Sequence, residues 1–274
     1  MSAPASSGTL RAVGLSKTFH AKGQAPVQVL NDCSLTVAPG RLTVLMGPSG
    51  SGKSTLAYIL AGYIEPSSGQ VFLDDAPVKG PGPNRLMIFQ ETTLWPWMTV
   101  NNNVLFGPLV RASDVKVEAQ NRARDLLARF GLVDFQDKYP GQLSGGMKRR
   151  AEIAQALINN PRVLIMDEPF RGLDVMTREL MQEYYLKVFE ETHPTTLFIT
   201  SEIEEAIFLA DVILFMDPAL GRIGHRIEVD LPRPRTFDVM ASEGYREIKQ
   251  RALDTLYAHE EVEAYSPQQT GMGG

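Results

Sequence analysis

The chain has 274 residues, 43% of them hydrophobic, with a formal net charge of −5 and a single cysteine, Cys33. This length is enough for a large buried core and for one or two domains. The mildly acidic charge, without a basic block, argues against a dedicated nucleic-acid binder. One cysteine excludes an intrachain disulfide and a Cys₂His₂ zinc site, and we expect Cys33 to be a small buried apolar residue.

Both ends of the chain are rich in small and polar residues. We expect a disordered lead-in over residues 1–8 and a disordered tail over residues 266–274. Residues 1–10 show no charged region followed by an apolar stretch, so they do not predict a signal peptide. No window reaches the ~20 apolar residues that span a bilayer. If the protein works at a membrane, other subunits provide the spans.

Short apolar runs alternate along the chain with longer amphipathic ones. The runs that predict strands are Leu42–Met46, Leu86–Phe89, Val163–Met166, Thr196–Thr200 and Val212–Met216. Helical patterns cover Ser54–Ala61 (closed by Gly62), a stretch capped by Ser113 that ends before Gly131, Leu180–Val188 and Ile203–Ala210. This alternation predicts an α/β domain whose mainly parallel sheet is covered by helices on both faces.

Two segments depart from the alternation. Residues 91–157 are mostly helical in pattern, which indicates a helical insertion in the α/β core. Pro232 and Pro234 mark a second boundary. Beyond them we expect a terminal helix with one apolar face, formed by Tyr245, Ile248, Ala252 and Leu256.

The strongest functional motif is a glycine-rich loop between a predicted strand and a predicted helix. Its residues are Gly47, Pro48, Ser49, Gly50, Ser51, Gly52, Lys53 and Ser54, which match the pattern G-x-x-x-x-G-K-[ST]. Glycines let successive backbone N–H groups point at phosphate oxygens, and the helix N-terminus favours negative charge. Lys53 reaches the β- and γ-phosphates, and the Ser54 hydroxyl is placed to ligate Mg²⁺.

A second motif, V-L-I-M-D-E-P over residues 163–169, ends an apolar strand in two adjacent carboxylates. In parallel sheets ligand chemistry lies at this end of the strands. Asp167 is the candidate Mg²⁺ ligand, and Glu168 is the candidate group that polarises the attacking water. Alone the motif is weak, since an apolar strand often ends in an acidic turn, but the phosphate loop strengthens it.

The third motif, L-S-G-G-M over residues 143–147, places Ser144 where it can cap a helix. The first turn of that helix would present unpaired N–H groups to a second anion. Two phosphate-gripping helix ends in one chain are explained if they hold the same nucleotide from different subunits.

Together these motifs resemble the nucleotide-binding subunit of ATP-binding cassette (ABC) transporters over about residues 9–230. Residues 47–54 resemble the Walker A loop, 163–168 the Walker B motif and 143–147 the signature motif, with Met147 where glutamine is commoner. The resemblance implies a P-loop NTPase core with a mainly parallel sheet, an N-terminal antiparallel β region and a helical subdomain at about 91–157. Residues 231–274 would then be a C-terminal helical extension and tail.

The resemblance also implies an ATPase that uses ATP and Mg²⁺, with a defined set of site residues. The implied catalytic residues are Glu168, Lys53, Gln90 and Ser201, and the implied metal ligands are Ser54, Gln90 and Asp167. The implied nucleotide-binding residues are Phe19, Gly47, Pro48, Ser49, Gly50, Ser51, Gly52, Lys53, Ser54, Thr55, Ser144, Gly145, Gly146 and Asp174. By themselves, Phe19 is more often a core residue and Asp174 can simply cap the following helix.

Ser201 is the main departure from the family pattern. The family has a histidine that contacts the γ-phosphate just after the strand that we expect at Thr196–Thr200, and no histidine lies between His193 and His225. Serine is shorter and cannot become cationic, so it cannot supply a charge-assisted contact. We therefore expect ATP to bind normally and to turn over more slowly than with histidine. Met147 and Arg171 are milder departures.

The segment Glu91–Val100 carries the candidate partner surface. Trp95 and Trp97 can anchor an interface, although they could also pack inside the helical insertion. The segments 89–100 and 232–235 are most similar to the nitrate, sulfonate and taurine importer subgroup. That likeness implies a homodimer or heterodimer of cassettes, contact of Glu91–Val100 with transmembrane permease subunits, an indirect link to a periplasmic or extracellular binding protein, and a peripheral position on the cytoplasmic face of the membrane.

Three other interpretations stay open. The first is a soluble ABC ATPase outside transport, which usually has coiled-coil arms or two cassettes in one chain. The second is a slow ATPase subunit that pairs with a different, histidine-bearing cassette. The third is a small-molecule kinase, which would explain residues 47–54 but would leave Gln90 and the motif at 143–147 without a purpose.

Overall fold

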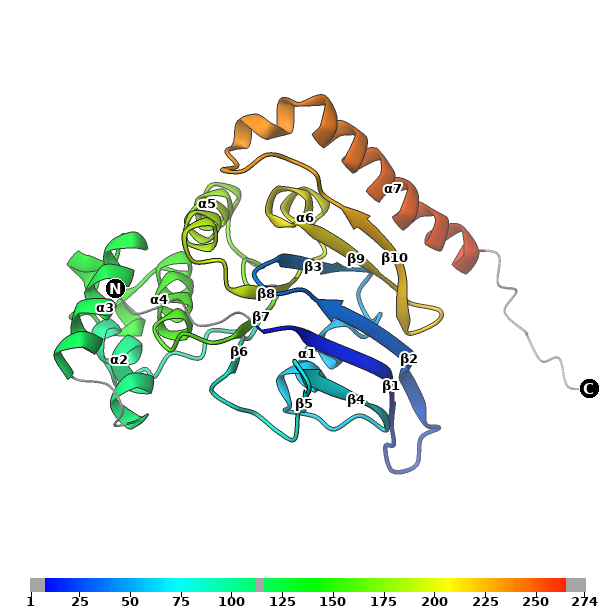
Figure 1. Ribbon diagram of the computed structural model, residues 1–274, viewed down its shortest axis with the longest axis horizontal. Helices are drawn as coiled ribbons and strands as arrows, with labels where there is room; N and C mark the ends of the chain where they lie inside the picture. Colours follow the sequence, from blue (N-terminus) through cyan, green and yellow to red (C-terminus); the bar gives the residue numbers. More distant parts are fainter. Residues whose placement is uncertain (1–7, 112–115, 265–274) are drawn as a thin grey trace, which may run out of the picture.

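The computed structural model describes residues 8–111 and 116–264, and a mixed six-stranded sheet forms its centre (Figure 1). The strand order is β10-β9-β3-β8-β7-β6. The strands are β3 (Leu42–Met46), β6 (Arg85–Ile88), β7 (Val163–Asp167), β8 (Thr195–Ile199), β9 (Val212–Asp217) and β10 (Arg222–Glu228). Neighbours run parallel except for the antiparallel β9–β10 pair. The predicted mainly parallel sheet is therefore confirmed.

A second, four-stranded sheet is antiparallel throughout and has the order β2-β1-β4-β5. Its strands are β1 (Leu10–Phe19), β2 (Val27–Val37), β4 (Ser68–Leu73) and β5 (Ala76–Pro77). The antiparallel N-terminal region implied by the family resemblance is confirmed. In Figure 1 this sheet and α1 (Lys53–Ala61) lie on one side of the central sheet.

The remaining helices form two groups. The helices α5 (Val175–Thr192) and α6 (Ile203–Leu209) cover the other face of the central sheet, and α7 (Glu243–Ala264) lies outside α6 (Figure 1). The helices α2 (Val100–Arg111), α3 (Lys116–Arg129) and α4 (Gly145–Leu157) gather beyond the β6 edge. Short 3₁₀ turns occupy Val133–Phe135, Pro140–Gln142 and Phe237–Ala241. None of the helices in the described part of the chain is long and apolar enough to span a bilayer.

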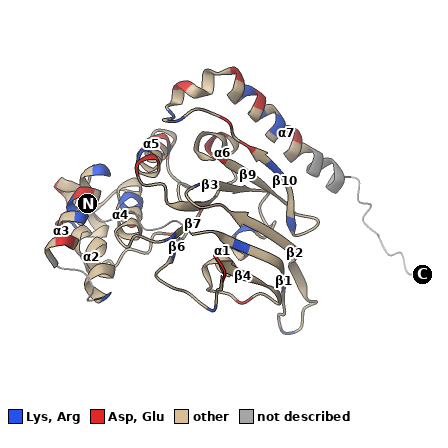
Figure 2. Cartoon of the chain, in the orientation of Figure 1, with Lys and Arg blue, Asp and Glu red and all other residues tan. Residues whose placement is uncertain are grey.

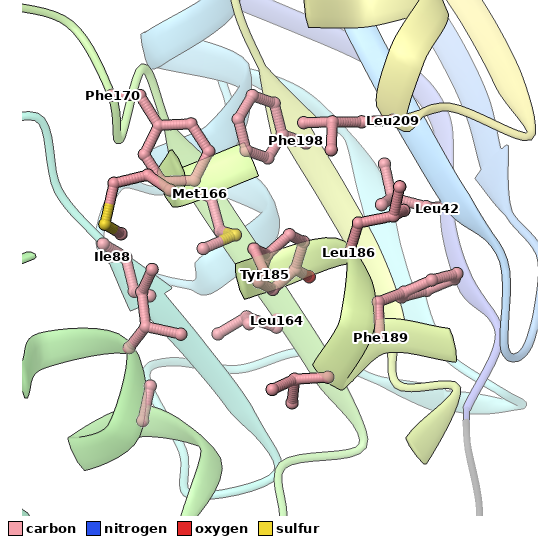
Figure 3. Packing of buried hydrophobic residues seen from close by; sticks show 14 of the residues in the cluster. Leu42, Ile88, Leu164, Met166, Phe170, Tyr185, Leu186, Phe189, Phe198 and Leu209 are labelled. Carbon is pink, nitrogen blue, oxygen red and sulfur yellow. The ribbon is translucent and has the colours of Figure 1, made fainter. Parts of the chain in front are cut away.

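The core has two layers because the central strands are buried on both faces. Alternate residues of β3 divide between them: Leu45 packs with α1 and the antiparallel sheet, whereas Val44 packs toward α5 and α6. Figure 3 shows the second layer, where Phe198, Tyr185 and Leu164 meet. Cys33 is buried in the first layer, as predicted, and this burial raises its pKa to about 11.

Left-handed glycines end two of the predicted helices. Gly62 closes α1 in a left-handed conformation (φ 89°) and its N–H bonds the Ile59 carbonyl, which confirms that helix end. Gly131 follows α3 and is also left-handed (φ 63°). The predicted cap Ser113 lies outside the described residues, as do residues 1–7 and 265–274.

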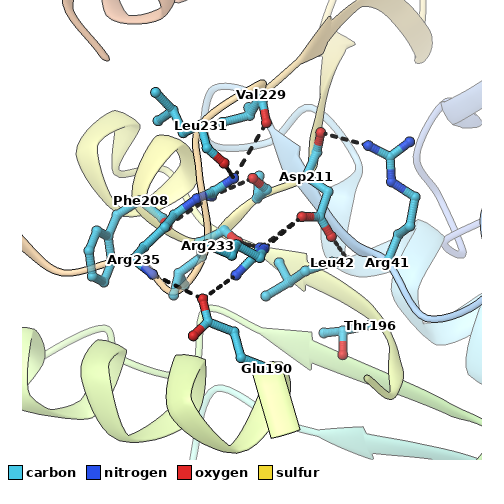
Figure 4. Close-up of polar contacts among 12 residues, drawn as sticks. Arg41, Leu42, Glu190, Thr196, Phe208, Asp211, Val229, Leu231, Arg233 and Arg235 are labelled. Atoms are coloured by element: carbon cyan, nitrogen blue, oxygen red, sulfur yellow. Dashed lines mark hydrogen bonds and ion pairs between the residues drawn. The ribbon is translucent and has the colours of Figure 1, made fainter. Parts of the chain in front are cut away.

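The segment after β10 is fastened to the sheet by two arginines (Figure 4). Arg235 donates to three carbonyls at the end of α6, Ile207, Phe208 and Ala210, and so satisfies acceptors that a helix end leaves open. Arg233 pairs with Glu190 at 3.1 Å and with Asp211 at 2.8 Å. Burial lowers the pKa of Arg235 to about 10.

The apolar face of α7 then packs on the core through Tyr245, Ile248 and Ala252, while charges of both signs alternate along its outer positions (Figure 2).

Candidate active site

The phosphate loop joins β3 to α1, and its backbone needs glycine. Gly50 and Gly52 adopt left-handed conformations with φ of 83° and 96°. A Cβ on Gly52 would also lie 3.1 Å from the Val29 carbonyl oxygen. Gly52 begins α1 without a side-chain cap, so amides of the first turn stay available to an anion.

Lys53 places its ammonium inside this loop. Its Nζ donates to the carbonyls of Gly47 and Pro48, at 2.8 Å each. Burial lowers the pKa of Lys53, and the neighbouring carboxylates of Glu168 and Asp167 oppose that shift. Among the described residues, the hydrogen-bond partners of the ammonium are carbonyl oxygens, which phosphate oxygens can replace with a stronger, charge-assisted contact.

Ser54 and Asp167 form a donor set that fits a hard divalent cation. Asp167 ends β7, and its carboxylate accepts a hydrogen bond from the Ser54 hydroxyl. The other feature is an orphaned oxygen: Asp167 Oδ1 is buried and has no hydrogen-bond partner within the described chain. Burial raises the pKa of Asp167. A cation coordinated by oxygen ligands would satisfy this oxygen and favour the ionised carboxylate.

Glu168 follows directly and has an unusual backbone. Its φ of 44° lies in the left-handed region, which non-glycine residues rarely adopt and which is common at functional sites. Its N–H donates to the Ile199 carbonyl of β8 at 2.9 Å. Its carboxylate pairs with Arg171 Nη1 at 2.5 Å. The carboxylate is thus held at the carboxyl end of the sheet, beside the strand that leads to Ser201.

The strand order brings Ser201 to the same edge. β8 lies between β3, which carries the phosphate loop, and β7, which carries Asp167. Ser201 follows β8 and shares a pocket of about 150 Å³ with Glu168. The structure therefore gathers Lys53, Ser54, Asp167, Glu168 and Ser201, predicted from separate parts of the sequence, at one edge of the sheet.

The signature segment lies on a different body of helices. Ser144 is the N-cap of α4 and accepts from the Met147 N–H at 3.3 Å, so the predicted cap is confirmed. A Cβ on Gly146 would come within 2.5 Å of Thr177 on α5, which explains glycine there. The helix α4 packs on α2, α3, α5 and β6, and its N-terminus belongs to the helical group rather than to the phosphate loop.

Three other predicted residues lie at the surface. Asp174 caps α5 by accepting from Thr177 N–H at 3.0 Å and Oγ at 2.6 Å, and these bonds lower its pKa. Phe19 ends β1 with an exposed ring, and Lys17 Nζ lies 5.1 Å from its centroid. Gln90 is exposed just after β6. None of the three is joined to the phosphate loop by a hydrogen bond within the described chain.

Sequence reasoning missed a buried network that ties α4 to the segment after β6. Arg149 donates to the Phe89 carbonyl at 2.7 Å and to the Gln90 carbonyl at 2.5 Å. It also pairs with Glu152 at 2.5 Å, and Glu152 accepts from the Thr93 N–H and hydroxyl at 2.9 and 2.7 Å. The only signal was an Arg and a Glu three residues apart on one helix, which usually indicates a solvated surface pair.

The aromatic segment forms an exposed cluster rather than a buried one. The Trp95 ring lies 5.3 Å from Trp97 and 5.7 Å from Phe106, and Trp97 is 65% exposed. Buried Asn103 holds the segment from below, since it accepts from the Trp95 N–H and donates to the Trp95 carbonyl. These facts disfavour the alternative in which both tryptophans pack inside the helical insertion.

Comparison with known proteins agrees with this geometry. The ABC transporter family model matches residues 30–171. The chain is 47% identical over 206 residues to the taurine import ATP-binding protein TauB of Pseudomonas fluorescens (strain Pf0-1), covering 75% of this chain and 78% of the relative. It is 39% identical over 244 residues to the nitrate import ATP-binding protein NrtD of Synechococcus elongatus, covering 88% and 89%.

A solved structure shows the same architecture. The dimeric post-hydrolysis state of the ATP-binding cassette MJ0796 bound to ADP and Pi matches with a TM-score of 0.71 at 27% identity, covering 81% of this chain and 100% of that one. The site defines a P-loop nucleoside triphosphatase. The chain belongs to the ABC transporter family, and it is an ATPase cassette of that family, as its sequence predicted.

Proposed function

We propose that this chain is the ATP-hydrolysing subunit of an importer for nitrate, a sulfonate such as taurine, or a similar small solute with an anionic group. The observation that carries the proposal is the meeting of Lys53, Asp167 and Glu168 at one sheet edge in a chain whose relatives are named for taurine and nitrate import. The exposed Trp95–Trp97–Phe106 cluster supports a docking surface for permease subunits. Such docking would keep the chain on the cytoplasmic face of the membrane.

Two copies would bind two ATP molecules between them. In each site the phosphate loop of one protomer holds the triphosphate, and the uncovered N-terminus of α4, at Ser144, Gly145 and Gly146, meets it from the partner. The solved structure of a cassette with 28% identity is dimeric, which supports a pairing of two copies. Both helix ends favour the negative γ-phosphate, so ATP closes the dimer and loss of the phosphate opens it. Phe19 would stack on adenine, and Asp174 would face the partner protomer.

In hydrolysis, the residues of this chain would accept a proton from water and stabilise the charge on the phosphate oxygens. Glu168 accepts a proton from water as the water oxygen attacks the γ-phosphorus, and the bond from that phosphorus to the β,γ-bridging oxygen breaks to release ADP and phosphate. Lys53 and the loop amides stabilise the charge that spreads over the phosphate oxygens. Ser54, Asp167 and Gln90 would hold a Mg²⁺ ion, which supplies further charge neutralisation there.

The test assembles the chain with candidate permease and substrate-binding subunits in sealed liposomes. We expect ATP-dependent uptake of taurine or nitrate, and turnover that rises when the loaded binding protein is added. Glu168→Gln should lower turnover by about 100-fold or more and trap an ATP-bound dimer. The exposed Glu179→Gln on α5 is the matched control.

Two outcomes would contradict the proposal. A Glu168→Gln chain that stays monomeric with ATP and hydrolyses it normally would remove Glu168 from the chemistry. An ATP turnover that is the same with and without the permease and binding protein would indicate a soluble ABC ATPase instead of a transport subunit.

A further inference from the structure

The pocket beside Glu168 contains two arginines, whereas Ser201 has no cationic donor. Its lining includes Glu168, Ser201, the two arginines Arg171 and Arg178, and Glu202. The Ser201 hydroxyl offers one donor and no charge. Contacts from a cationic donor to an anion are about twice as strong as neutral ones. Among the residues that line this pocket, a cationic donor would therefore have to be Arg171 or Arg178.

Arg171 is the arginine that contacts the reactive carboxylate. Its Nη1 lies 2.5 Å from Glu168 Oε2, and its own N–H donates to the Glu168 carbonyl at 3.1 Å. Arg178 instead donates to the Leu173 carbonyl at 3.3 Å and lies 3.9 Å from Glu202.

The backbone beside Arg171 is anchored in the core, while its side chain is largely exposed. Phe170 is buried in the core, with its ring 5.5 Å from that of Phe198 (Figure 3). The Arg171 side chain is 56% exposed, against 11% for Glu168. The guanidinium is therefore accessible to a bound group, while Phe170 anchors the turn that carries Glu168.

The Arg171 guanidinium also lies within electrostatic reach of the phosphate loop. Its charge acts on Lys53, where it adds to the lowering of the pKa that burial causes. A guanidinium has five N–H donors in a planar fork, so it can keep a carboxylate on one edge and donate to a second anion from the other.

We propose that Arg171 donates to the terminal phosphate of bound ATP while it positions Glu168, and so supplies the charge-assisted contact that Ser201 cannot make. This inference rests on the proposed ATP hydrolysis at this edge of the sheet and names a further residue for it. It also explains how the chain tolerates serine at position 201.

A double-mutant cycle on the full 274-residue chain tests the proposal, with phosphate release and ATP binding measured separately. We expect Arg171→Ala to lower kcat by about 100-fold, the scale for loss of one donor to developing charge, with the Kd for ATP changed by less than about threefold. Arg171→Lys keeps the positive charge but loses the planar pair of donors, so its kcat should lie between those of the parent and Arg171→Ala. Ser201→His should raise kcat at least about tenfold in the Arg171→Ala chain and at most about threefold in the parent.

The matched control is Arg226→Ala. Arg226 has a similar exposure (53%), and it pairs with Glu228 on the edge strand β10, away from the strands that carry the site. This substitution should leave kcat unchanged. Arg171→Ala turnover within threefold of the parent overturns the proposal, and so does an equal gain from Ser201→His in both backgrounds. A parent chain that hydrolyses no ATP would instead overturn the proposed function, so the two failures are distinguishable.

Discussion

Single residues at the site depend on burial for their charge state. Burial disfavours both the ammonium of Lys53 and the carboxylate of Asp167, and each group's charge in turn favours the other's ionised form. Neither group has an ionic partner at hydrogen-bond distance in the described chain. A bound triphosphate with its cation would supply the opposite charge to each, so these residues favour the ligand over the empty site.

The buried carboxyl of Glu205 predicts how the stability of the fold depends on pH. It is buried on α6 and accepts from Gln182 Nε2 at 2.9 Å, and burial raises its pKa. A raised folded pKa means that the folded protein holds this proton to higher pH than the unfolded chain, so stability is lost as pH rises through the folded value. Glu205→Gln keeps an acceptor and removes the ionisation.

We therefore expect the Tm of Glu205→Gln to exceed that of the parent by about 2–4 °C near pH 8, with the gain shrinking toward pH 5. Differential scanning calorimetry across this range checks it, with the exposed Glu179→Gln as control. A Tm difference independent of pH would show that Glu205 does not titrate in this range.

At the scale of elements, α4 and the segment after β6 behave as one piece. Arg149 reaches two carbonyls of that segment, and its partner Glu152 holds Thr93. The residues between them include Gln90 and lead to Trp95. A rotation of α4 would therefore be transmitted to the segment that carries Gln90 and leads to Trp95.

Removing one partner of this pair should cost more than removing both. Arg149→Met leaves Glu152 buried without its cation, so we expect the free energy of unfolding to fall by about 3–5 kcal/mol. The double variant Arg149→Met with Glu152→Leu should be less destabilised than Arg149→Met alone, although the carbonyls of Phe89 and Gln90 lose their donor in both. Urea unfolding of the three chains measures this, and an additive, larger loss in the double variant would contradict it.

At the scale of the whole molecule, one chain presents two halves of a site that do not meet. The phosphate loop lies at the carboxyl end of the interior strand β3, and Ser144 begins a helix of the group beyond β6 (Figure 1). In the proposed dimer, pairing of two identical chains about a two-fold axis would complete both sites at once.

Mixing two inactive variants tests this pairing. Ser144→Arg alone should abolish turnover, as should Glu168→Gln. Refolded together, they should recover about a quarter of the parent turnover, because half of the dimers are mixed and each mixed dimer has one complete site. Ser144→Arg turnover equal to that of the parent would show a self-sufficient pocket within one protomer.

Much of this protein is encoded in local sequence. Gly52 followed by Lys53 and Ser54 predicts the phosphate loop, since only glycine fits the left-handed backbone there. The apolar run that ends in Asp167 predicts a strand buried on both faces. Such features depend on neighbours in the chain, so periodicity and turn chemistry reveal them.

Other features were decided only by the tertiary structure. The predicted strand ends shift by one residue, to Ile199 at the end of β8 and Ile88 at the end of β6, because hydrogen bonds to neighbouring strands set them.

The roles of Arg149 and Arg171 were hidden because an arginine near a glutamate in sequence usually forms a solvated pair. Burial of the first beneath a distant loop, and placement of the second at the sheet edge beside Ser201, follow from contacts between segments about 30 to 60 residues apart. Sequence spacing carries no record of such contacts, because the desolvation cost of an arginine and the partners that offset it are set only by the folded structure.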